Sequence, residues 1–366
     1  MVENDDFKKF LSIKTPVVVY NLDDLSRKLY ELNQLIPEWV NVIYSVKANS
    51  NKKIIDFFKE SNLIKGFEVA SVQELQKVEK FYEEEIFVTG PGFSDDQIKK
   101  CMKKGHVYDF NNIEQIYRMK NVLKNRNIGI RMNLEKSELE HNKNDLTSRF
   151  GIDIKNLKHG KFSEFLINYN IKVTHIHIHN GEKDLNELKK ITRLISEIIE
   201  NNCLSNDLNI NIGGGWEHIL KNNLFNKAII ELQRIKKISN SNLYIEPGKA
   251  LIDSIGYLVA SLINKYHSKN CLNLILNVSA HNLITWFPTY PIVSNKNSDS
   301  KIVTNIWGNT CYEEDFFVKK LTIDELDIDD KIIFHPFGAY FKSNSKKLHD
   351  IDFPKEVYYQ NGTFVQ

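Results

Sequence analysis

The chain has 366 residues, 42 % of them hydrophobic and 26 % charged, which suits a globular protein with a large domain and a smaller one. Its formal net charge of +2 excludes the strong basic field typical of nucleic-acid-binding proteins. The acidic N-terminus resembles no signal peptide, no apolar run is long enough for a bilayer, and the four cysteines lack CxxC spacing, so we expect a cytoplasmic protein.

The first two thirds of the chain alternate between short β-rich runs and polar stretches with helical periodicity. The β-rich runs occupy residues 41–49, 66–71, 85–92, 106–112, 127–133, 172–181, 209–215 and 243–248. Eight β–α repeats of this length predict a parallel (β/α)8 barrel, an α/β fold, over residues 21–250.

The rhythm changes after residue 250, where strand-like runs follow one another without clear helices between them. This pattern predicts an antiparallel β domain, a sandwich or barrel, in residues 251–366. The run TPVVVY at residues 15–20 has no early partner, so we assign residues 1–20 to the same β domain.

Active sites of (β/α)8 barrels lie at the C-terminal ends of the strands, so reactive residues there are the first candidates. These ends carry Lys47, Glu68, Arg131, His179, Gly213, Gly214, Gly215 and Glu246. Because different strands deliver them to one face of the barrel, they form a better candidate site than scattered charges would.

Three of these features suggest a phosphorylated carbonyl cofactor. Lys47 beside an acid could form a Schiff base with a carbonyl group. The glycines could cradle a phosphate with their backbone N–H groups, and Glu246 could keep a pyridine nitrogen protonated. Each feature also has a structural interpretation: a surface lysine, a glycine turn and a salt-bridged or capping glutamate.

The run HIHIH places His175, His177 and His179 on one side of a strand. His179 is the outermost and could stack on a planar ring, whereas the deeper two fit the barrel core. A shared metal ion is the alternative, but no carboxylate cluster follows on the neighbouring runs, so we predict no metal.

Two C-terminal segments add further candidates. GNTCYEEDFF contains Cys311 and Asp315, and FGAYF contains Tyr340. Cys311 could donate a proton or act as a nucleophile, or it could be a quietly buried thiol. Tyr340 could reach a phosphate oxygen or could simply pack.

In chain order, these segments resemble the ornithine/diaminopimelate decarboxylase family, pyridoxal 5′-phosphate (PLP) enzymes with an alanine-racemase-like barrel. The resemblance covers nearly the whole chain and rests on YSVKANS, GFEVASVQEL, IGIRMN, SRFGI, IHNGE, INIGGGW, IEPGK, GNTCYEEDFF and FGAYF. It implies covalent attachment of PLP to Lys47 and a homodimer with shared active sites, in which the partner subunit supplies the cysteine that matches Cys311. The implied cofactor contacts are Lys47, Glu68, Arg131, His179, Gly213, Gly214, Gly215, Glu246, Gly248, Lys249 and Tyr340.

The chain departs from the family after the EPG motif and at positions that contact the substrate. Lys249 replaces the usual arginine after EPG; a lysine can still bind phosphate as a point charge but lacks the planar fork of that arginine. Tyr312 replaces an acidic residue, Thr285 and Trp286 stand where an arginine binds a distal carboxylate, and NVSAHN contains no acid for a distal amine. We expect substrate contacts from Tyr312, Asp315, His281 and Thr285.

These departures predict an amino-acid decarboxylase for a modified or conjugated substrate, rather than for plain diaminopimelate or ornithine. Lys47 would release the product amine, and Cys311 would protonate the α-carbon. A PLP-dependent amino-acid racemase on the same scaffold, a non-catalytic PLP-binding relative and, more distantly, a metal hydrolase built on the histidine run are the alternatives.

Overall fold

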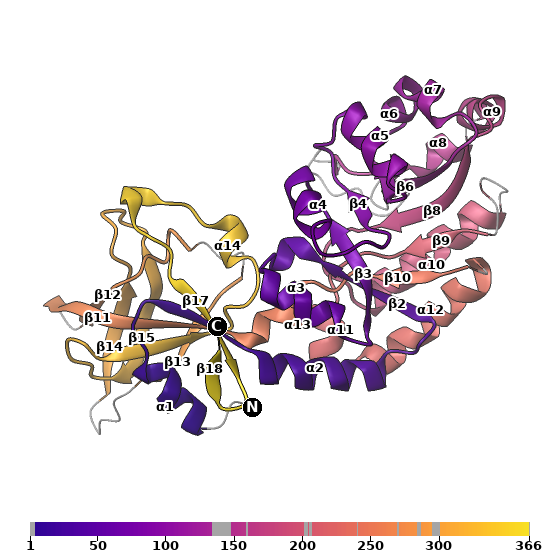
Figure 1. Ribbon diagram of the computed structural model, residues 1–366. Helices are drawn as coiled ribbons and strands as arrows, with labels where there is room; N and C mark the ends of the chain where they lie inside the picture. The colour runs from indigo at the N-terminus through magenta and orange to yellow at the C-terminus, as the bar shows by residue number, and fades with distance from the viewer. Residues whose placement is uncertain are drawn as a thin grey trace. The chain divides into compact units, whose positions relative to one another are not determined.

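A computed structural model describes residues 4–133, 148–158, 160–200, 204, 207–239, 241–268, 271–283, 287–294 and 301–365. The chain divides into two compact units: a barrel unit of Glu31–Ala250, and a β unit of Met1–Tyr30 with Leu251–Gln366 (Figure 1). None of the helices that the structure describes is long and apolar enough to cross a membrane.

The barrel unit confirms the predicted (β/α)8 architecture. In the part of the chain that the structure describes, eight parallel strands form a ring that the β5–β6 pair closes. They are β2 (Val40–Ser45), β3 (Ile64–Val69), β4 (Phe87–Thr89), β5 (Val107–Phe110), β6 (Asn127–Asn133), β8 (Lys172–Ile178), β9 (Asn209–Asn211) and β10 (Leu243–Ile245). Each overlaps one β-rich run of the sequence, and a short extra strand, β7 (Ile152–Asp153), pairs with β6.

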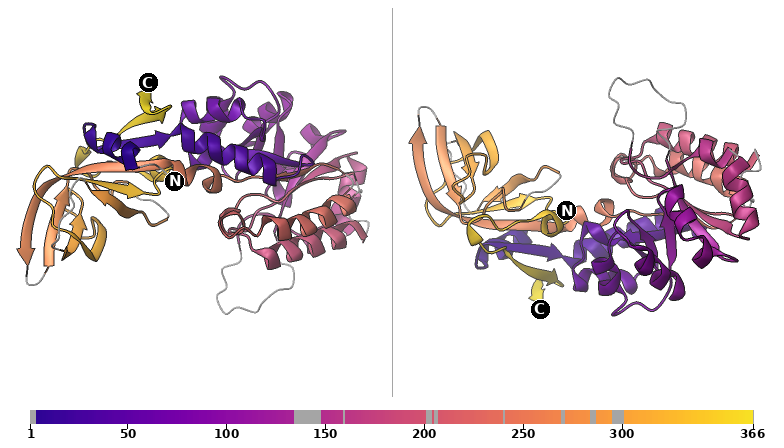
Figure 2. Two further views of the ribbon diagram at one scale, coloured as in Figure 1. Left: turned by 90° about the horizontal axis from the view of Figure 1, so that it is seen from below. Right: turned by 90° about the horizontal axis from the view of Figure 1, so that it is seen from above.

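Helices alternate with the barrel strands in sequence, and the first of them precedes β2. In chain order they are α2 (Leu22–Leu35), α3 (Lys52–Lys59), α4 (Val72–Val78), α5 (Asp95–Lys103), α6 (Ile113–Arg118), α7 (Lys120–Leu123), α8 (Ile154–Lys158), α9 (Gly160–Asn168), α10 (Leu185–Glu200), α11 (Glu217–Lys221), α12 (Phe225–Ser239) and α13 (Lys249–Ile252). The long helices α10 and α12 lie side by side (Figure 2). α10 buries Leu188, Ile191, Ile195 and Ile198, the spacing of one helical face.

Side-chain caps define where several of these helices begin. Asn51, Ser71, Ser94 and Asn112 each accept a hydrogen bond from a backbone N–H in the first turn of the following helix. At α5, Gln97 also bonds back to the backbone of Ser94 and completes a capping box. These caps end the turns that leave the C-terminal ends of the strands, where the candidate site lies.

The β unit contains the N-terminal strand, as predicted. β1 (Val17–Asn21) pairs antiparallel with β11 (Gly256–Ser268) and parallel with β17 (Lys355–Gln360). The other strands are β12 (Cys271–Leu276), β13 (Tyr290–Ser294), β14 (Lys301–Trp307), β15 (Phe316–Asp324), β16 (Lys331–His335) and β18 (Thr363–Val365). Because β1–β17 and β12–β14 are parallel pairs, the sheet is mixed where we expected purely antiparallel pairing.

Short helices complete the β unit. α1 (Asn4–Ser12) packs Phe10 against Tyr257 and Tyr359, with ring centroids 5.4 and 5.0 Å away, and so covers one part of its core. The remaining segments are α14 (Phe341–Asn344) and the 3-10 turns η2 (Asp253–Ile255) and η3 (Leu348–Asp350).

Candidate active site

Lys47 lies just beyond the end of β2, in the 3-10 turn η1 (Val46–Ala48). Its Nζ donates a 2.7 Å hydrogen bond to Oε2 of Glu68, at the end of the adjacent strand β3. The Glu68 side chain is fully buried, whereas the Lys47 side chain is 31 % exposed. The pair therefore presents an accessible amine that a buried carboxylate holds in place.

Glu246 follows β10, which is the other neighbour of β2 in the ring. Ser45 Oγ donates to the Glu246 backbone oxygen at 3.3 Å, and a β-carbon on Gly248 would lie 3.0 Å from that of Ala48. The turns that carry Lys47 and Glu246 therefore adjoin at the same end of the barrel.

The Glu246 carboxylate is buried and held from two sides. Oε1 accepts a 2.6 Å hydrogen bond from Asn211 Nδ2, and Oε2 lies 3.4 Å from His177 Nε2. Burial alone would raise the pKa of Glu246, but the charges of His177 and Lys47 outweigh burial and lower it. An ionised carboxylate thus lies inside the barrel end, where it could face a protonated pyridine nitrogen.

The glycine run forms a tight turn after β9. Gly213 and Gly215 have φ values of +67° and +81°, which only glycine adopts readily. The Gly213 N–H donates to Asn211 Oδ1 and the Gly214 N–H donates to His179 Nδ1, both at 2.9 Å. Side chains of the protein therefore occupy two of the N–H groups that we expected to cradle a phosphate.

Replacing Gly215 with alanine is expected to destabilise the protein by at least about 2 kcal/mol. The new β-carbon would lie 1.9 Å from the Gly181 backbone oxygen, at a positive φ. Gly92→Ala is the matched control, because nothing lies within 4 Å of its β-carbon position, and should change stability by less than about 0.5 kcal/mol. Urea unfolding measures both variants, and equal effects would contradict this account.

His179 is partly buried directly after β8. Because its Nδ1 accepts the Gly214 N–H, the neutral ring carries its proton on Nε2. Burial, together with the nearby charges of Lys183 and Lys47, lowers the pKa of His179 well below its usual value. A neutral, oriented ring is suited to stacking on a planar cofactor.

The deeper histidines lie in the barrel core with a buried acid that the sequence did not single out. Asp109 Oδ1 is 3.6 Å from His175 Nε2, and Oδ2 is 3.5 Å from His177 Nδ1. Burial raises the pKa of Asp109 well above its usual value and lowers that of His175 to about 3. Burial thus favours the neutral forms of both Asp109 and His175, an arrangement suited to a core.

His177, His179 and Glu246 also form a possible metal site, which the sequence did not lead us to predict. Donor atoms of His177, His179 and Glu246 all lie within 4.8 Å of one another. His179 Nδ1 and Glu246 Oε1 already accept hydrogen bonds from the protein, so these two atoms have partners without an ion.

Arg131, on β6, bonds the backbone of His179. Its Nη2 donates to the His179 backbone oxygen at 3.1 Å, and its guanidinium lies 4.7 Å from the ring centroid of Phe150. Burial lowers the pKa of Arg131, and the opposing effect of Glu246, Glu68 and Asp109 does not fully offset it. Phe150 belongs to the segment SRFGI, so this segment packs against the site.

Lys249 does not present an isolated charge. Its Nζ pairs with Oε2 of Glu217, the first residue of α11, and Lys221 pairs with the other oxygen of the same carboxylate. Although partial burial raises the pKa of Glu217, its bonds with Lys221 and Lys249 lower it overall. A carboxylate therefore opposes the lysine that we expected to attract phosphate.

Lys183, in the loop between β8 and α10, was not among the residues predicted from the sequence. Its residue exposure is 0 %, its Nζ donates to the Gly214 backbone oxygen, and its backbone N–H donates to the Gly215 oxygen at 2.7 Å. Burial lowers the pKa of Lys183 to about 8. The lysine directly after IHNGE was the available signal, but its contact with the glycine turn depends on the folded loop.

We expect apoprotein stability to rise between about pH 8 and pH 10.5, relative to Lys183→Met, by about 3 kcal/mol. Below pH 8, burial of the charged amine disfavours folding. Between pH 8 and the ordinary lysine pKa of 10.5, the unfolded chain binds more protons than the folded one, so the free energy of unfolding rises with pH until this penalty is gone. Chemical denaturation of both proteins across this range measures the difference. A difference that does not vary with pH would contradict the buried amine.

The remaining candidates belong to the β unit, apart from Thr285 and Trp286, which lie outside the described residues. Cys311 is exposed, which rules out the quietly buried thiol. Tyr312 is 45 % exposed, and its ring centroid lies 4.1 Å from that of His281. Tyr340 has a left-handed backbone, and its ring centroid lies 5.9 Å from that of Phe287.

Asp315 has a structural role within this group. It is buried; Oδ1 accepts the His281 N–H at 2.8 Å, and Oδ2 accepts from the Thr310 N–H at 3.0 Å and Oγ1 at 2.6 Å. Three hydrogen bonds leave little capacity for the substrate contact that we predicted. Asp315 instead orients the backbone beside His281 and Tyr312.

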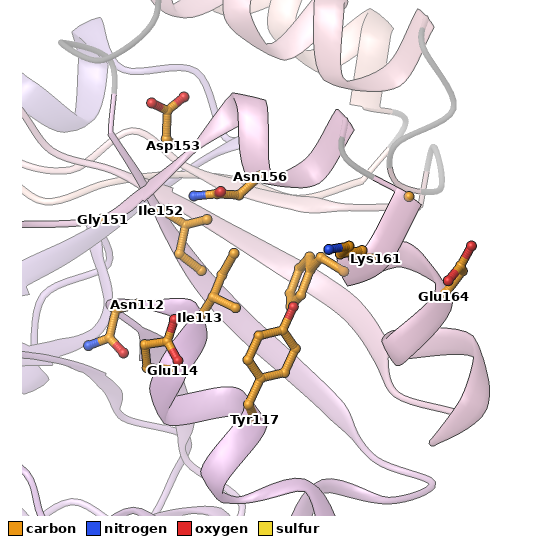
Figure 3. A pocket seen from close by; sticks show the side chains of 12 residues that line it. Asn112, Ile113, Glu114, Tyr117, Gly151, Ile152, Asp153, Asn156, Lys161 and Glu164 are labelled. Carbon is orange, nitrogen blue, oxygen red and sulfur yellow. The ribbon is translucent and has the colours of Figure 1, made fainter.

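A separate pocket of about 810 Å³ lies on the barrel unit, where residues of α6 face residues of α8 and α9 (Figure 3). Glu114 and Tyr117 come from α6, and Asn156, Lys161 and Glu164 come from α8 and α9. None of the residues that line it belongs to the site predicted from the sequence.

Known proteins to which this chain is similar include decarboxylases. A family model described as the pyridoxal binding domain of pyridoxal-dependent decarboxylases matches residues 22–253. The chain is 23 % identical over 362 residues to the 2-[(L-alanin-3-ylcarbamoyl)methyl]-2-hydroxybutanedioate decarboxylase of Staphylococcus aureus, covering 88 % of each. It is 25 % identical over 399 residues to the diaminopimelate decarboxylase of Buchnera aphidicola, covering 98 % of this chain and 91 % of the relative.

A solved structure shows the same fold. Diaminopimelate decarboxylase from Helicobacter pylori, complexed with L-lysine, aligns with a TM-score of 0.79 and 20 % identity. The alignment covers 98 % of this chain and 95 % of that one, so the similarity includes both units.

Proposed function

This chain belongs to the pyridoxal-dependent decarboxylase family, and from that premise we propose that it decarboxylates a modified or conjugated amino acid on PLP. One observation carries the proposal: the accessible amine of Lys47, bonded to buried Glu68, lies at the same barrel end as the buried carboxylate of Glu246. An amine for covalent attachment and an acid for a ring nitrogen are two groups that suit PLP-dependent decarboxylation.

The residues at this end fit the cofactor. Lys47 would hold PLP covalently, His179 would offer a neutral ring to its face, and the turn at Gly213–Gly215 would receive its phosphate. Bound PLP supplies an electron sink for the bond that breaks at the α-carbon. Glu246 would hold a proton on the pyridine nitrogen, since neighbouring positive charges keep its carboxylate ionised.

The β unit carries the groups that we assign to the substrate. The exposed ring of Tyr312 packs against the half-buried ring of His281. Cys311, the proposed proton donor, precedes Tyr312 in the sequence and is exposed. An aromatic pair favours a substrate with a larger or modified side chain over one with a bare distal charge. The name of the Staphylococcus aureus relative describes an alanine moiety joined through an amide to a hydroxybutanedioate, which supports a conjugated substrate here.

A panel of α-amino acids with conjugated and with plain side chains tests this proposal. We expect CO2 release from a conjugated member and little from diaminopimelate or ornithine. Loss of optical rotation without CO2 would instead indicate a racemase, and PLP binding without turnover across the panel would indicate a non-catalytic relative. Metal analysis of the purified protein tests the alternative use of His177, His179 and Glu246.

We also propose a cytoplasmic homodimer in which each active site takes Cys311 from the partner subunit. The exposure of this thiol supports the proposal. Mixing the inactive variants Lys47→Ala and Cys311→Ala under subunit exchange should restore about a quarter of wild-type activity, because mixed dimers then contain one intact site. Light scattering measures the mass, and a monomer, or no recovery after proven exchange, would refute sharing.

A further inference from the structure

A buried amine holds the glycine turn from one side. Lys183 bonds both carbonyl oxygens at the centre of the turn, that of Gly214 through Nζ and that of Gly215 through its backbone N–H. Its side chain is fully buried, and Nζ lies 6.0 Å from the ring centroid of Trp216. A buried lysine is costly unless its charge or its hydrogen bonds are used.

These two bonds determine where the turn directs its donors. In a planar trans peptide, the C=O of one residue and the N–H of the next point in opposite directions. Because Lys183 attracts the carbonyls of Gly214 and Gly215, the N–H groups of Gly215 and Trp216 point away from it. Successive N–H groups around a left-handed glycine form an anion-binding nest, and Gly215 has such a backbone.

The other N–H groups of the turn are already used. Asn211 accepts that of Gly213, and His179 accepts that of Gly214. The nearby charge of Lys249 is opposed by Glu217, which bonds Lys221 as well. Lys183 differs from Lys249 in its partner. The Nζ of Lys183 bonds a backbone oxygen of the turn, whereas the Nζ of Lys249 pairs with a carboxylate.

We propose that Lys183 holds the Gly213–Gly215 turn in its phosphate-binding form and supplies the positive charge that selects a phosphorylated cofactor, in place of Lys249. This inference rests on the proposed function only in taking PLP as the cofactor. Lys183 acts through the turn, so it is a positioning residue.

The test compares apoprotein affinity for PLP and for pyridoxal, which lacks the phosphate, by absorbance titration. We expect Lys183→Met to weaken PLP binding at least tenfold and to change pyridoxal binding less than twofold. Lys183→Gln keeps an N–H donor without the charge and should show the same losses as Lys183→Met. It replaces the methionine variant in the test if that variant does not fold. Lys189→Met, an exposed lysine on α10, is the matched control and should match wild type.

Lys249→Met completes the comparison and should lower the preference for PLP over pyridoxal less than threefold. The inference is overturned if a folded Lys183 variant keeps the wild-type preference, or if Lys249→Met alone abolishes it. Thermal unfolding with and without inorganic phosphate gives a second readout, in which phosphate should stabilise wild type and not the Lys183 variants. Wild type that binds PLP but releases no CO2 would sink the proposed reaction and leave this test intact.

Discussion

Lys47→Ala should abolish the visible absorption band that PLP gives with the wild-type protein and lower CO2 release at least about 10³-fold. Lys47 offers an accessible amine bonded to a buried carboxylate, so its loss removes the covalent attachment and leaves Glu68 without its cation. Titration of the apoprotein with PLP measures the band, and CO2 capture measures the reaction.

Two controls separate attachment from charge. Lys47→Arg keeps a cation beside Glu68 but has no amine for attachment, so it should lose the band as the alanine variant does. Lys52→Met removes an exposed lysine five residues away and should leave both readouts unchanged. Borohydride reduction followed by peptide mass analysis should locate the cofactor on Lys47. Recovery of the cofactor on Lys183, the buried amine that bonds the glycine turn, would refute the assignment.

The barrel could be predicted from the sequence because its signal is local. Each strand is a short run of β-prone residues followed by a turn and a helix, and the polar caps at Asn51, Ser71 and Ser94 mark where the helices begin. The pairing of β1 with C-terminal strands could be inferred because an apolar run without a partner strand nearby in the sequence needs one farther along the chain. Its parallel pairing with β17 depends on how the C-terminal strands return, which no local pattern specifies.

The roles of individual charges were harder to predict because a sequence shows residue types and not their partners. Lys249 looked like a phosphate-binding cation, but Glu217, which opposes it, is 32 positions away in the chain. Asp315 looked like a substrate-binding acid, but backbone donors around His281 and Thr310 use its oxygens. Lys183 escaped notice because its contact forms only when the loop after β8 meets the turn after β9. Asn211 escaped notice because its partner, Glu246, follows a different strand, β10.

Glu246 combines these local and long-range effects. Its place after a barrel strand could be read from the sequence, but its ionised state comes from His177 on β8 and from Lys47 after β2. Asn211, on β9, holds one carboxylate oxygen at 2.6 Å. Three separate strands thus keep a negative charge inside the barrel, and this charge is what a protonated pyridine ring needs.

Glu246→Gln is expected to lower CO2 release at least about 10²-fold while PLP still gives its absorption band. Glutamine keeps the size of the side chain and an oxygen for Asn211 Nδ2, but it removes the charge that would hold the pyridine proton. Because Lys47 is intact, covalent attachment should survive, so this variant separates binding from electron withdrawal. Steady-state kinetics should show the loss mainly in kcat.

Glu60→Gln, at an exposed glutamate at the end of α3, is the control and should match wild type in both readouts. Thermal unfolding of the apoproteins checks that Glu246→Gln folds. A folded variant that binds PLP and keeps activity within about threefold of wild type would exclude Glu246 as the partner of the ring nitrogen. The buried carboxylate would then serve only through its contacts with Asn211 and His177, and another group would have to stabilise the electrons left at the α-carbon.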